Sequence, residues 1–302
     1  MKARVVVVGS LNMDLVTRAE RLPRAGETLA GESFDTVPGG KGANQAVAAV
    51  RLGADVAMIG CVGSDDYGQQ LRDGLLTEGI DCGAVATVAG VSSGVALIVV
   101  DATSQNAIVI VAGSNARLLP ESIQRFDKLL QDADVIVCQM EIPSQTVAYV
   151  LERGRALGKT VILNPAPATG PLPMEWLANI DYLIPNESEA AALTGLPVDD
   201  LASAEVVARQ LRSLGVARVI VTLGAGGALL VGAEGSEHFT APAVRALDAT
   251  AAGDTFVGAF AAALARGRSE REAIGFGQRA AAISVTRSGA QPSIPRLAEL
   301  EP

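Results

Sequence analysis

The alternation of short apolar runs with amphipathic segments along the chain predicts an α/β protein. Runs rich in β-branched apolar residues predict buried strands, at 4–8, 56–61, 134–138, 160–163, 182–185 and 218–222. Apolar positions spaced three and four residues apart predict helices, at 41–52, 65–78, 120–130, 144–157, 203–214 and 269–285, with others beginning near 187 and 253. Strands and helices that alternate in this way form a mainly parallel sheet covered by helices on both faces.

Two segments depart from this alternation, and together they predict a small β-sheet lid. The polar segment 12–37 is broken by proline and glycine, and Glu27 to Ala30 suggests short half-buried strands. Segment 92–112 contains two β-rich runs, 94–100 and 106–111, joined by a polar turn. Near the C-terminus, 227–231 and 237–240 predict an antiparallel meander. We expect a single domain over 1–302, with a lid formed by about 12–37 and 92–112.

Composition and charge argue against several classes of protein. The net charge of −9, without a basic patch, disfavours binding to nucleic acid or to an anionic membrane. No apolar stretch is long enough to span a membrane, and 5–8 is too short for a secretion signal. The cysteines, Cys61, Cys82 and Cys138, lack C-x-x-C spacing, which is typical of reduced thiols in a cytoplasmic protein. His238 is the only histidine, which argues against a histidine-based triad or a multi-histidine metal site.

A turn and helix start near the C-terminus suggest a site for a phosphate group. Small residues ending in Gly253 allow a tight bend, and the alanine-rich run that follows favours a buried helix. The free amides at such a helix start carry roughly half a positive charge and bind anions. Asp254 places a carboxylate beside that anion site. The alternative is structural, because an acidic residue in the first turn also stabilises a helix.

Polar residues follow three of the predicted strands. In open α/β sheets, ligands bind beyond the carboxyl ends of the strands. Asn12 and Asp14 follow the first strand, Lys41 and Asn44 lie near a helix start after the lid segment, and Glu141 follows 134–138. Amides, carboxylates and one ammonium suit a polyol better than an apolar ligand. Alternatively, the glycine-rich turn around Lys41 is a plain loop and Glu141 a helix-start charge.

Known nucleotide-binding motifs do not fit the chain. Neither serine nor threonine follows Lys41, so 39–44 is not a Walker A loop. The glycine-rich segment 222–227 leads into another strand, so the dinucleotide fingerprint fails, although a nucleotide can still lie against its backbone. Asn186, Glu187 and Glu189 stand at a helix start, where they would lie near a phosphate or its hydrated magnesium. A capping arrangement explains these three residues equally well.

Several motifs in consistent order give the chain a family resemblance. It resembles the ribokinase-like (PfkB) carbohydrate kinases over nearly its whole length, in 39–46, 164–167, 185–187, 222–224, 248–256 and 287–293. The resemblance implies a three-layer α/β/α fold with a β lid, and ATP and Mg²⁺ as co-substrate. It further implies transfer of the γ-phosphoryl group to the O5 hydroxyl of ribose.

The resemblance also implies roles for single residues. Asp254 matches the catalytic base, and the amides of Ala251, Ala252 and Gly253 match the anion hole. Ribose-binding positions correspond to Asn12, Met13, Asp14, Gly40, Lys41, Gly42, Ala43, Asn44, Glu141 and Asp254. Nucleotide-binding positions correspond to Asn186, Thr222, Leu223, Gly224, Ala225, Gly226, Gly227, Gly253, Asp254 and Gln278, although Gln278 departs from the family pattern and leaves the adenine contacts open. An activating K⁺ corresponds to Asp248, Thr250, Ser284, Arg287, Gly289 and Ser293, mostly through carbonyls.

Phosphoryl transfer is also consistent with the residues themselves. A sugar hydroxyl is too weak an acid for a carboxylate to deprotonate in advance. Because the transition state is loose, Asp254 needs mainly to align the hydroxyl and accept its proton late.

Other functions stay open at this point. One alternative is a kinase of the same fold that acts on deoxyribose, another sugar or a nucleoside, and a second is a regulator that binds a sugar or a nucleotide without catalysis. A nicotinamide-dependent dehydrogenase is disfavoured by the missing fingerprint. The resemblance further implies a homodimer joined through lid strands, and the β edges expected at 27–35 and 94–111 provide a surface for it.

Overall fold

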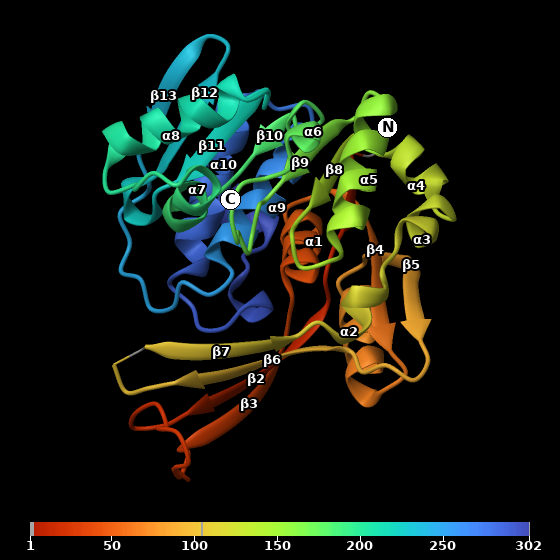
Figure 1. Ribbon diagram of the computed structural model, residues 1–302, viewed down its shortest axis with the longest axis vertical. Coiled ribbons are helices and arrows are strands. Elements are labelled where there is room, and N and C mark those ends of the chain that lie inside the picture. The colour runs from red at the N-terminus through yellow and green to blue at the C-terminus, as the bar shows by residue number, and fades with distance from the viewer. Residues whose placement is uncertain (1–2, 104, 302) are drawn as a thin grey trace.

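A central sheet organises the computed structural model, which describes residues 3–103 and 105–301 (Figure 1). Its nine strands, in spatial order, are β13 (Gly235–Phe239), β12 (Ala228–Gly232), β11 (Arg218–Thr222), β10 (Tyr182–Leu183), β9 (Thr160–Leu163), β8 (Val135–Cys138), β1 (Arg4–Val8), β4 (Asp55–Gly63) and β5 (Asp81–Val88). All neighbouring pairs from β11 to β5 are parallel, whereas β12 and β13 pair antiparallel. The predicted mainly parallel sheet is confirmed.

The two faces of β1 explain the three layers of the fold. Val5 and Val7 pack into one hydrophobic cluster, and Val6 and Val8 pack into another, because successive strand residues point to opposite faces. The first cluster includes residues of α1 (Lys41–Arg51), α2 (Asp66–Thr77), α9 (Ala252–Ala265) and α10 (Glu270–Ser284). The second includes residues of α3 (Pro120–Gln124), α4 (Asp127–Asp132), α5 (Ser144–Ala156), α6 (Met174–Leu177), α7 (Glu187–Thr194) and α8 (Leu201–Ser213). The predicted α/β/α arrangement is therefore confirmed.

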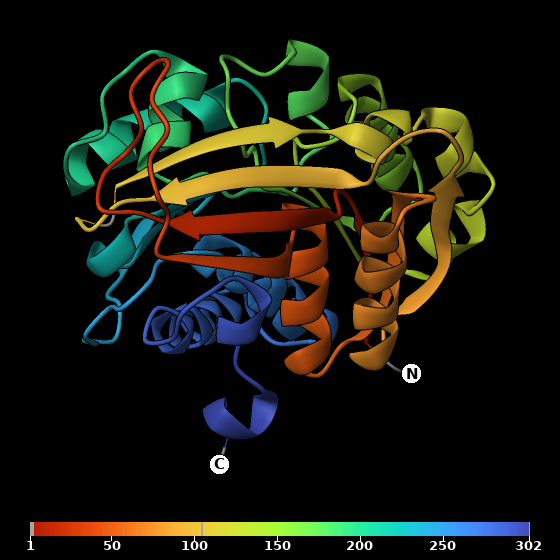
Figure 2. The same cartoon turned by 90° about the horizontal axis from the view of Figure 1, so that it is seen from below.

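A second sheet projects from one end of this body and forms the predicted lid (Figure 1). Its strands, in spatial order, are β3 (Ser33–Gly39), β2 (Asn12–Arg18), β6 (Gly94–Val100) and β7 (Asn106–Val111). The view from below shows the four strands side by side (Figure 2). Since β2 starts at Asn12 and β3 leads directly into α1, the base of the lid joins the body where the polar site residues were predicted.

The structure corrects two local predictions and adds one strand that was not predicted. Glu27 to Ala30 lies outside any strand, in the connection between β2 and β3, where the Glu27 carboxylate accepts bonds from Arg21 and from the Arg24 amide. Segment 120–130 is not one helix, because α3 and α4 are separated by residues with 3₁₀-type hydrogen bonds, such as that from the Phe126 amide to the Ile123 carbonyl. The edge strand β5 was not predicted, since its aspartate and glycine interrupt the apolar pattern.

Shorter elements complete the described chain. Three short 3₁₀ helices are η1 (Gly113–Arg117), η2 (Gly224–Gly226) and η3 (Gln291–Ser293), and the short helix α11 (Leu297–Leu300) lies near the C-terminus. Among residues 3–103 and 105–301, every helix is too short or too polar to cross a bilayer.

Candidate active site

Asp254 lies in the first turn of α9, at the bend that the sequence singled out. The helix follows Ala251, which has a φ of 58° and so reverses the chain in the left-handed region. The Asp254 carboxylate is 7% exposed and faces α1. Its Oδ2 accepts a hydrogen bond from Asn44 Nδ2 at 3.0 Å, and its Oδ1 accepts one from Gln45 Nε2 at 2.9 Å. The carboxylate is therefore held by two neutral amides, and in the described part of the chain no cationic side chain forms an ion pair with it.

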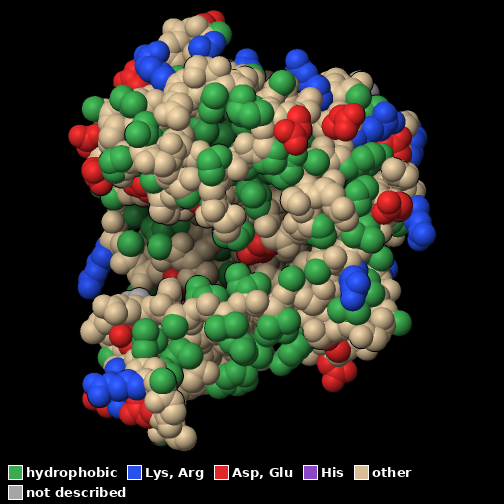
Figure 3. Space-filling view, viewed as in Figure 1, with side chains coloured by type: hydrophobic (Ala, Val, Ile, Leu, Met, Phe, Trp, Pro, Cys, Tyr) green, Lys and Arg blue, Asp and Glu red, His purple; other side chains and the backbone are tan. Residues whose placement is uncertain are grey.

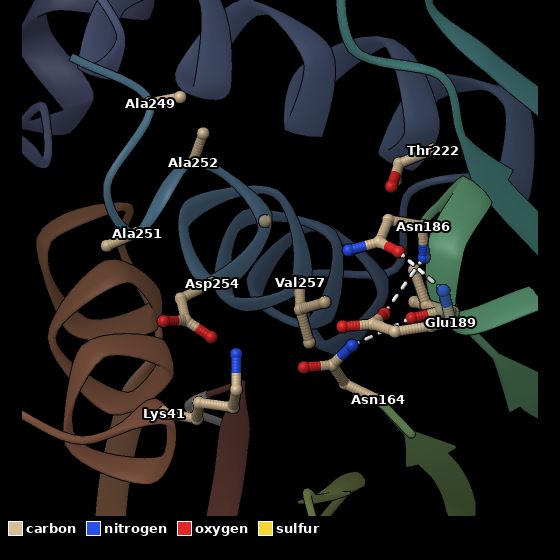
Figure 4. Close-up of a pocket in the computed structure, with 12 residues that line it drawn as sticks. Lys41, Asn164, Asn186, Glu189, Thr222, Ala249, Ala251, Ala252, Asp254 and Val257 are labelled. Atoms are coloured by element: carbon tan, nitrogen blue, oxygen red, sulfur yellow. Dashed lines mark hydrogen bonds between the residues drawn. The ribbon is translucent and has the colours of Figure 1, made fainter. Parts of the chain in front are cut away.

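The same carboxylate opens onto a cavity of about 210 Å³ (Figure 4). This cavity lies at the carboxyl ends of β9, β10 and β11, where ligands bind in open α/β sheets. Its lining combines the starts of α1, α7 and α9 with the strand ends: Lys41, Asn164, Ile184, Asn186, Glu189, Thr222, Ala249, Ala251, Ala252, Gly253, Asp254 and Val257. The structure thus brings together residues that the sequence assigned separately to the sugar, the base and the nucleotide.

The start of α9 presents unpaired amides to this cavity. Within the described chain, no acceptor is bonded to the N–H groups of Ala251, Gly253 and Asp254. The Ala252 N–H donates to the Ala249 carbonyl at 3.2 Å, so its predicted place in an anion hole requires that this long bond be shared or given up. A helix of this length with free amides at its start attracts an anion.

Charged side chains on the sugar side influence one another. Burial, followed by repulsion from Glu141 and Asp254, raises the pKa of Asp14 from 3.8 to about 7. Burial alone would lower the pKa of Lys41, but attraction to Asp254, Glu141 and Glu189 outweighs it, so that pKa is raised. Figure 4 shows the Lys41 ammonium pointing toward the Asp254 carboxylate. Three carboxylates and one ammonium thus form a compact polar group.

Glu141 is anchored at the start of α1. Its Oε2 accepts from the Ser10 hydroxyl at 2.5 Å and from the Lys41 amide at 3.1 Å. Gly40 precedes this point with a φ of 88°, and a Cβ there would lie 2.7 Å from the Asn12 amide nitrogen. Only glycine allows so close an approach of the two chain segments that carry the sugar-site residues.

The remaining predicted sugar-site residues contribute in different ways. Asn12 is 3% exposed, and its Oδ1 accepts from Asn115 Nδ2 at 2.8 Å, so its own amide nitrogen is directed elsewhere. Gly42 is buried in the first turn of α1. Met13 and Ala43 have side chains in the hydrophobic core, so they can meet a sugar only through backbone groups or by shaping the core beneath it. Asn115 itself was not predicted, since it is remote in sequence and belongs to no motif.

On the nucleotide side, Asn186 caps α7 and also lines the cavity. Its Oδ1 accepts from the Glu189 amide at 2.8 Å, and Glu189 Oε2 accepts from the Asn186 amide at 2.9 Å. The capping interpretation of these residues is therefore correct, and it is compatible with a ligand role because both line the cavity. Burial raises the pKa of Glu189 despite the Asn186 hydrogen bond and the attraction of Lys41.

The glycine-rich loop lies beside this capping pair. Thr222 ends β11 and lines the cavity, Leu223 is half-buried, and the loop continues through the exposed residues Gly224, Ala225 and Gly226 to Gly227. Nε2 of the single histidine, His238, lies 2.7 Å from the Gly226 carbonyl oxygen. Gln278 is 7% exposed and donates from Nε2 to the Phe239 carbonyl at 2.7 Å. The Gln278 bond ties α10 to the end of β13 near this loop.

Three of the residues matched to potassium are joined by one carboxylate. Asp248 Oδ1 accepts from the Thr250 amide at 2.9 Å and from its hydroxyl at 2.6 Å, and Oδ2 accepts from the Gly289 amide at 2.8 Å. Burial acts to raise the pKa of Asp248, but these hydrogen bonds outweigh it and the pKa is lowered. The segment before α9 is thereby tied to the loop after α10.

The other three residues of that set form local bonds. The Ser284 and Ser293 hydroxyls donate to carbonyls three residues earlier, at 2.9 and 2.7 Å. Arg287 forms an ion pair with Glu299. Their side chains are therefore engaged, so only backbone carbonyls could meet a cation, and the Ser284 carbonyl already accepts from the Arg287 amide at 3.0 Å.

Three buried amides beside Asp254 were not assigned a role from the sequence. Gln45 is hydrogen-bonded both to Asn164, which lines the cavity, and to Gln139. Each stands within a motif or strand end that the sequence analysis noted, next to residues that were assigned. Only the tertiary structure shows that they contact one another.

Comparison with known proteins extends the likeness over the body and lid together. The family model for pfkB family carbohydrate kinase matches residues 2–297. The chain is 42% identical to a ribokinase of Haemophilus influenzae over 295 residues, which cover 98% of this chain and 96% of that protein. It is 40% identical to a deoxyribokinase of Salmonella typhimurium over 293 residues, covering 97% and 96%. The structure of Arabidopsis thaliana ribokinase complexed with ribose and ATP superimposes with a TM-score of 0.94, at 34% identity over 100% of this chain and 98% of that one.

Proposed function

The chain belongs to the pfkB family of carbohydrate kinases, and we propose that it transfers the γ-phosphoryl group of ATP to O5 of D-ribose, giving D-ribose 5-phosphate and ADP. One observation carries the proposal most directly. The Asp254 carboxylate and the free amides of Gly253 and Asp254 open onto one cavity, so a base and an anion site stand side by side. A phosphoryl transfer to an alcohol needs both groups in this relation.

Asp254 is the base in this mechanism. The sugar hydroxyl attacks phosphorus in line, the new O5–P bond forms as the bond to the β-phosphate oxygen breaks, and the hydroxyl proton passes to the carboxylate. Because the two amide hydrogen bonds fix both carboxylate oxygens, the acceptor lone pair is aimed before the sugar arrives. The amides of Ala251, Ala252 and Gly253 stabilise charge on the transferring group, and donors of this kind contribute about 3 to 4 kcal/mol each.

The ribose site lies between the lid base and α1. Asn44 Oδ1 is buried, and no donor in 3–103 or 105–301 is bonded to it. A buried acceptor without a donor costs stability, which a ribose hydroxyl would recover on binding. Asp14, Asn12, Glu141 and the backbone at Gly40 to Ala43 complete the set of groups around the sugar. The Lys41 ammonium offsets part of the negative charge of this group, because it is attracted to Asp254, Glu141 and Glu189.

ATP lies along the loop from Thr222 to Gly227 and reaches the start of α9 with its phosphates. Asn186 and Glu189 line the cavity between these two places, and their oxygens are of the type that binds Mg²⁺ or accepts hydrogen bonds from its bound waters. These residues therefore fit a hydrated Mg²⁺, which supplies positive charge to the phosphates when bound. Gln278 lies near the adenine end, where its carbonyl oxygen is the acceptor left over after its bond to Phe239.

An activating K⁺ completes the cofactor set, near Asp248, Thr250, Ser284, Arg287, Gly289 and Ser293. The fit rests on the Asp248 carboxylate, which ties the segment before α9 to the loop after α10. A cation held there by carbonyls would stabilise the bend that presents the anion-hole amides. Replacing K⁺ by Na⁺ in the assay is expected to lower turnover, and equal rates in the two salts would remove K⁺ from the proposal.

The exposed lid supports a homodimer. Apolar residues of β6 and β7 are about half exposed, with Val109 at 61%, and Figure 3 shows hydrophobic side chains gathered over the lid, below a hollow. We propose that the chain is one domain and that its lid, 12–37 and 92–112, closes over ribose. The lid also pairs with the lid of a second copy of the chain. We further propose that the enzyme is cytoplasmic. The free thiols Cys61, Cys82 and Cys138 agree with a reducing compartment. Analytical ultracentrifugation tests the dimer, and Val109→Lys is expected to yield monomer.

Deoxyribose is a second candidate substrate, because the identity to a deoxyribokinase is close to that of the ribokinases. A coupled ADP assay over ribose, deoxyribose, fructose and adenosine separates the candidates. We expect the highest kcat/KM with ribose. A higher value with deoxyribose would move the substrate assignment to that sugar. ADP release with none of them, despite measurable ribose binding, would favour a sugar-binding regulator.

A further inference from the structure

Gln45 is a completely buried amide on α1 that contacts the Asp254 carboxylate, although neither the sequence motifs nor the family resemblance assigned it a role. Its Nε2 donates to Asp254 Oδ1 at 2.9 Å and to Asn164 Oδ1 at 3.1 Å. Its Oε1 accepts from Gln139 Nε2 at 2.6 Å. Both N–H groups and the carbonyl oxygen of this side chain are therefore hydrogen-bonded, and one of the N–H groups is bonded to the Asp254 carboxylate.

The Ile184 backbone carbonyl, which is bonded to Asn164, determines which atoms donate and which accept in the bonds among Asn164, Gln45 and Asp254. The Ile184 carbonyl can only accept, so the Asn164 amide nitrogen must face it, and these atoms are 2.8 Å apart. Asn164 Oδ1 is consequently an acceptor, and the Gln45 amide nitrogen must face it in turn. The opposite orientation of Gln45 would set its Oε1 against two oxygens, the Asn164 carbonyl and the Asp254 carboxylate. Gln45 is thus locked with both N–H groups pointing toward Asp254 and Asn164.

The backbone under this network is also fixed. A Cβ at Gly258 would lie 2.5 Å from the Gln45 carbonyl oxygen and 2.5 Å from the Ala48 Cβ, so α1 and α9 are in close contact one turn beyond Asp254. The Gln45 amide therefore cannot withdraw from the carboxylate by a shift of either helix. Its distance to Asp254 is set by the fold, before any ligand binds.

We infer that Gln45 is a positioning residue for phosphoryl transfer: it holds Asp254 Oδ1 by a charge-assisted hydrogen bond, which orients the carboxylate toward the substrate. The inference rests on the proposed function of Asp254. A donated hydrogen bond stabilises the ionised carboxylate. Other charges act on the same carboxylate, from Lys41 on α1, Asp14 on β2 and Glu189 on α7, and they are unchanged when only Gln45 is replaced. Loss of the bond should leave the carboxylate free to rotate away from the position in which it meets the sugar hydroxyl.

The test compares Gln45→Met with Gln139→Met. Methionine keeps the length of glutamine without a donor, and Gln139 is one bond further from Asp254 and does not contact it. With the best sugar of the panel, we expect Gln45→Met to lower kcat by about 10- to 100-fold while the KM values for sugar and ATP stay within about threefold. Gln139→Met should keep kcat within about threefold of wild type.

A second variant protects the test against a folding failure. Gln45→Glu has the shape of glutamine and can still accept from Gln139, but it sets a carboxyl oxygen against Asp254 in place of a donor, so its kcat should also fall by at least about 10-fold. Thermal unfolding with and without ribose shows that each variant is folded and binds. If turnover of both Gln45 variants matches wild type, or if only KM changes, the inference is wrong. Failure of the proposed function is distinct, because the wild-type enzyme would then phosphorylate no sugar.

Discussion

Replacing Asp14 by asparagine separates the role of this carboxyl in ribose binding from its effect on stability. Its pKa is raised from 3.8 to about 7, first by burial and then by Glu141 and Asp254. The folded protein therefore binds this proton more tightly than the unfolded chain does. Below about pH 4 the carboxyl is neutral in both states and costs nothing. As the pH rises from about 4 to about 7, stability is lost, and above pH 7 the loss is constant.

The size of this loss follows from the pKa difference. About three units at 1.36 kcal/mol per unit gives roughly 4 kcal/mol above pH 7, and partial solvent screening reduces this to about 2 to 4 kcal/mol. At pH 5 the same calculation leaves less than half of it. Asparagine keeps the shape and cannot ionise, so Asp14→Asn should be more stable than wild type by about 2 to 4 kcal/mol at pH 8 and by about 2 kcal/mol less at pH 5.

Urea-induced unfolding at pH 5 and pH 8, without sugar, measures this difference. Asp73→Asn is the matched control, since Asp73 is exposed on α2 and the same charge is removed there. The stabilised Asp14→Asn variant should also bind ribose more weakly, because it has lost a charged acceptor. A stability difference that is the same at both pH values, or that matches the control, would refute the reasoning. In that case burial and the neighbouring carboxylates do not act on Asp14 as described.

Two further predictions concern the backbone around the site. Gly94→Ala would place a Cβ 2.1 Å from Asn12 Oδ1 and 2.7 Å from the Leu11 carbonyl oxygen. The variant should therefore lose about 1 to 3 kcal/mol of stability in thermal unfolding, and its KM for ribose should rise more than its KM for ATP. An unchanged KM for ribose would contradict this prediction. Ala251→Gly should keep turnover and stay within about 1 kcal/mol of wild-type stability, because glycine adopts positive φ readily. Ala251→Val should lose turnover, because a β-branched residue is strongly disfavoured at a φ of 58° and would displace the anion-hole amides. Equal turnover of the two Ala251 variants would show that the bend is not needed.

The sequence predicted the centre of the fold because local pattern and tertiary environment agree there. Val5 to Val8 is apolar at every position, as a strand buried on both faces must be. The lid strands were placed less well, since β3 is exposed along most of its length and carries no alternation. The edge strand β5 was missed for a similar reason. The periodicity of apolar residues in the sequence reflects which side chains are buried, so strands with little buried surface are difficult to predict from it.

Much of the site was predictable, and its supporting groups were not. The glycine bend before an alanine-rich helix indicated Asp254, and the family motifs indicated Lys41 and Asn186. Nothing in the spacing of Gln45 and Asn115 indicates that the first would contact a carboxylate 209 residues away or that the second would hold Asn12. Those contacts depend on how the helices and the lid pack. The reacting groups could therefore be identified from local sequence, whereas their positioning residues required the structure.

Asp254→Asn tests the central claim most directly. The measurement is the turnover number for ribose and ATP, together with the dissociation constant of each ligand for the same variant. Aspartate acting as the base predicts that turnover falls by about 10² to 10⁴ while both dissociation constants stay within a few-fold. Near-normal turnover would contradict the account, because the amide cannot accept the hydroxyl proton.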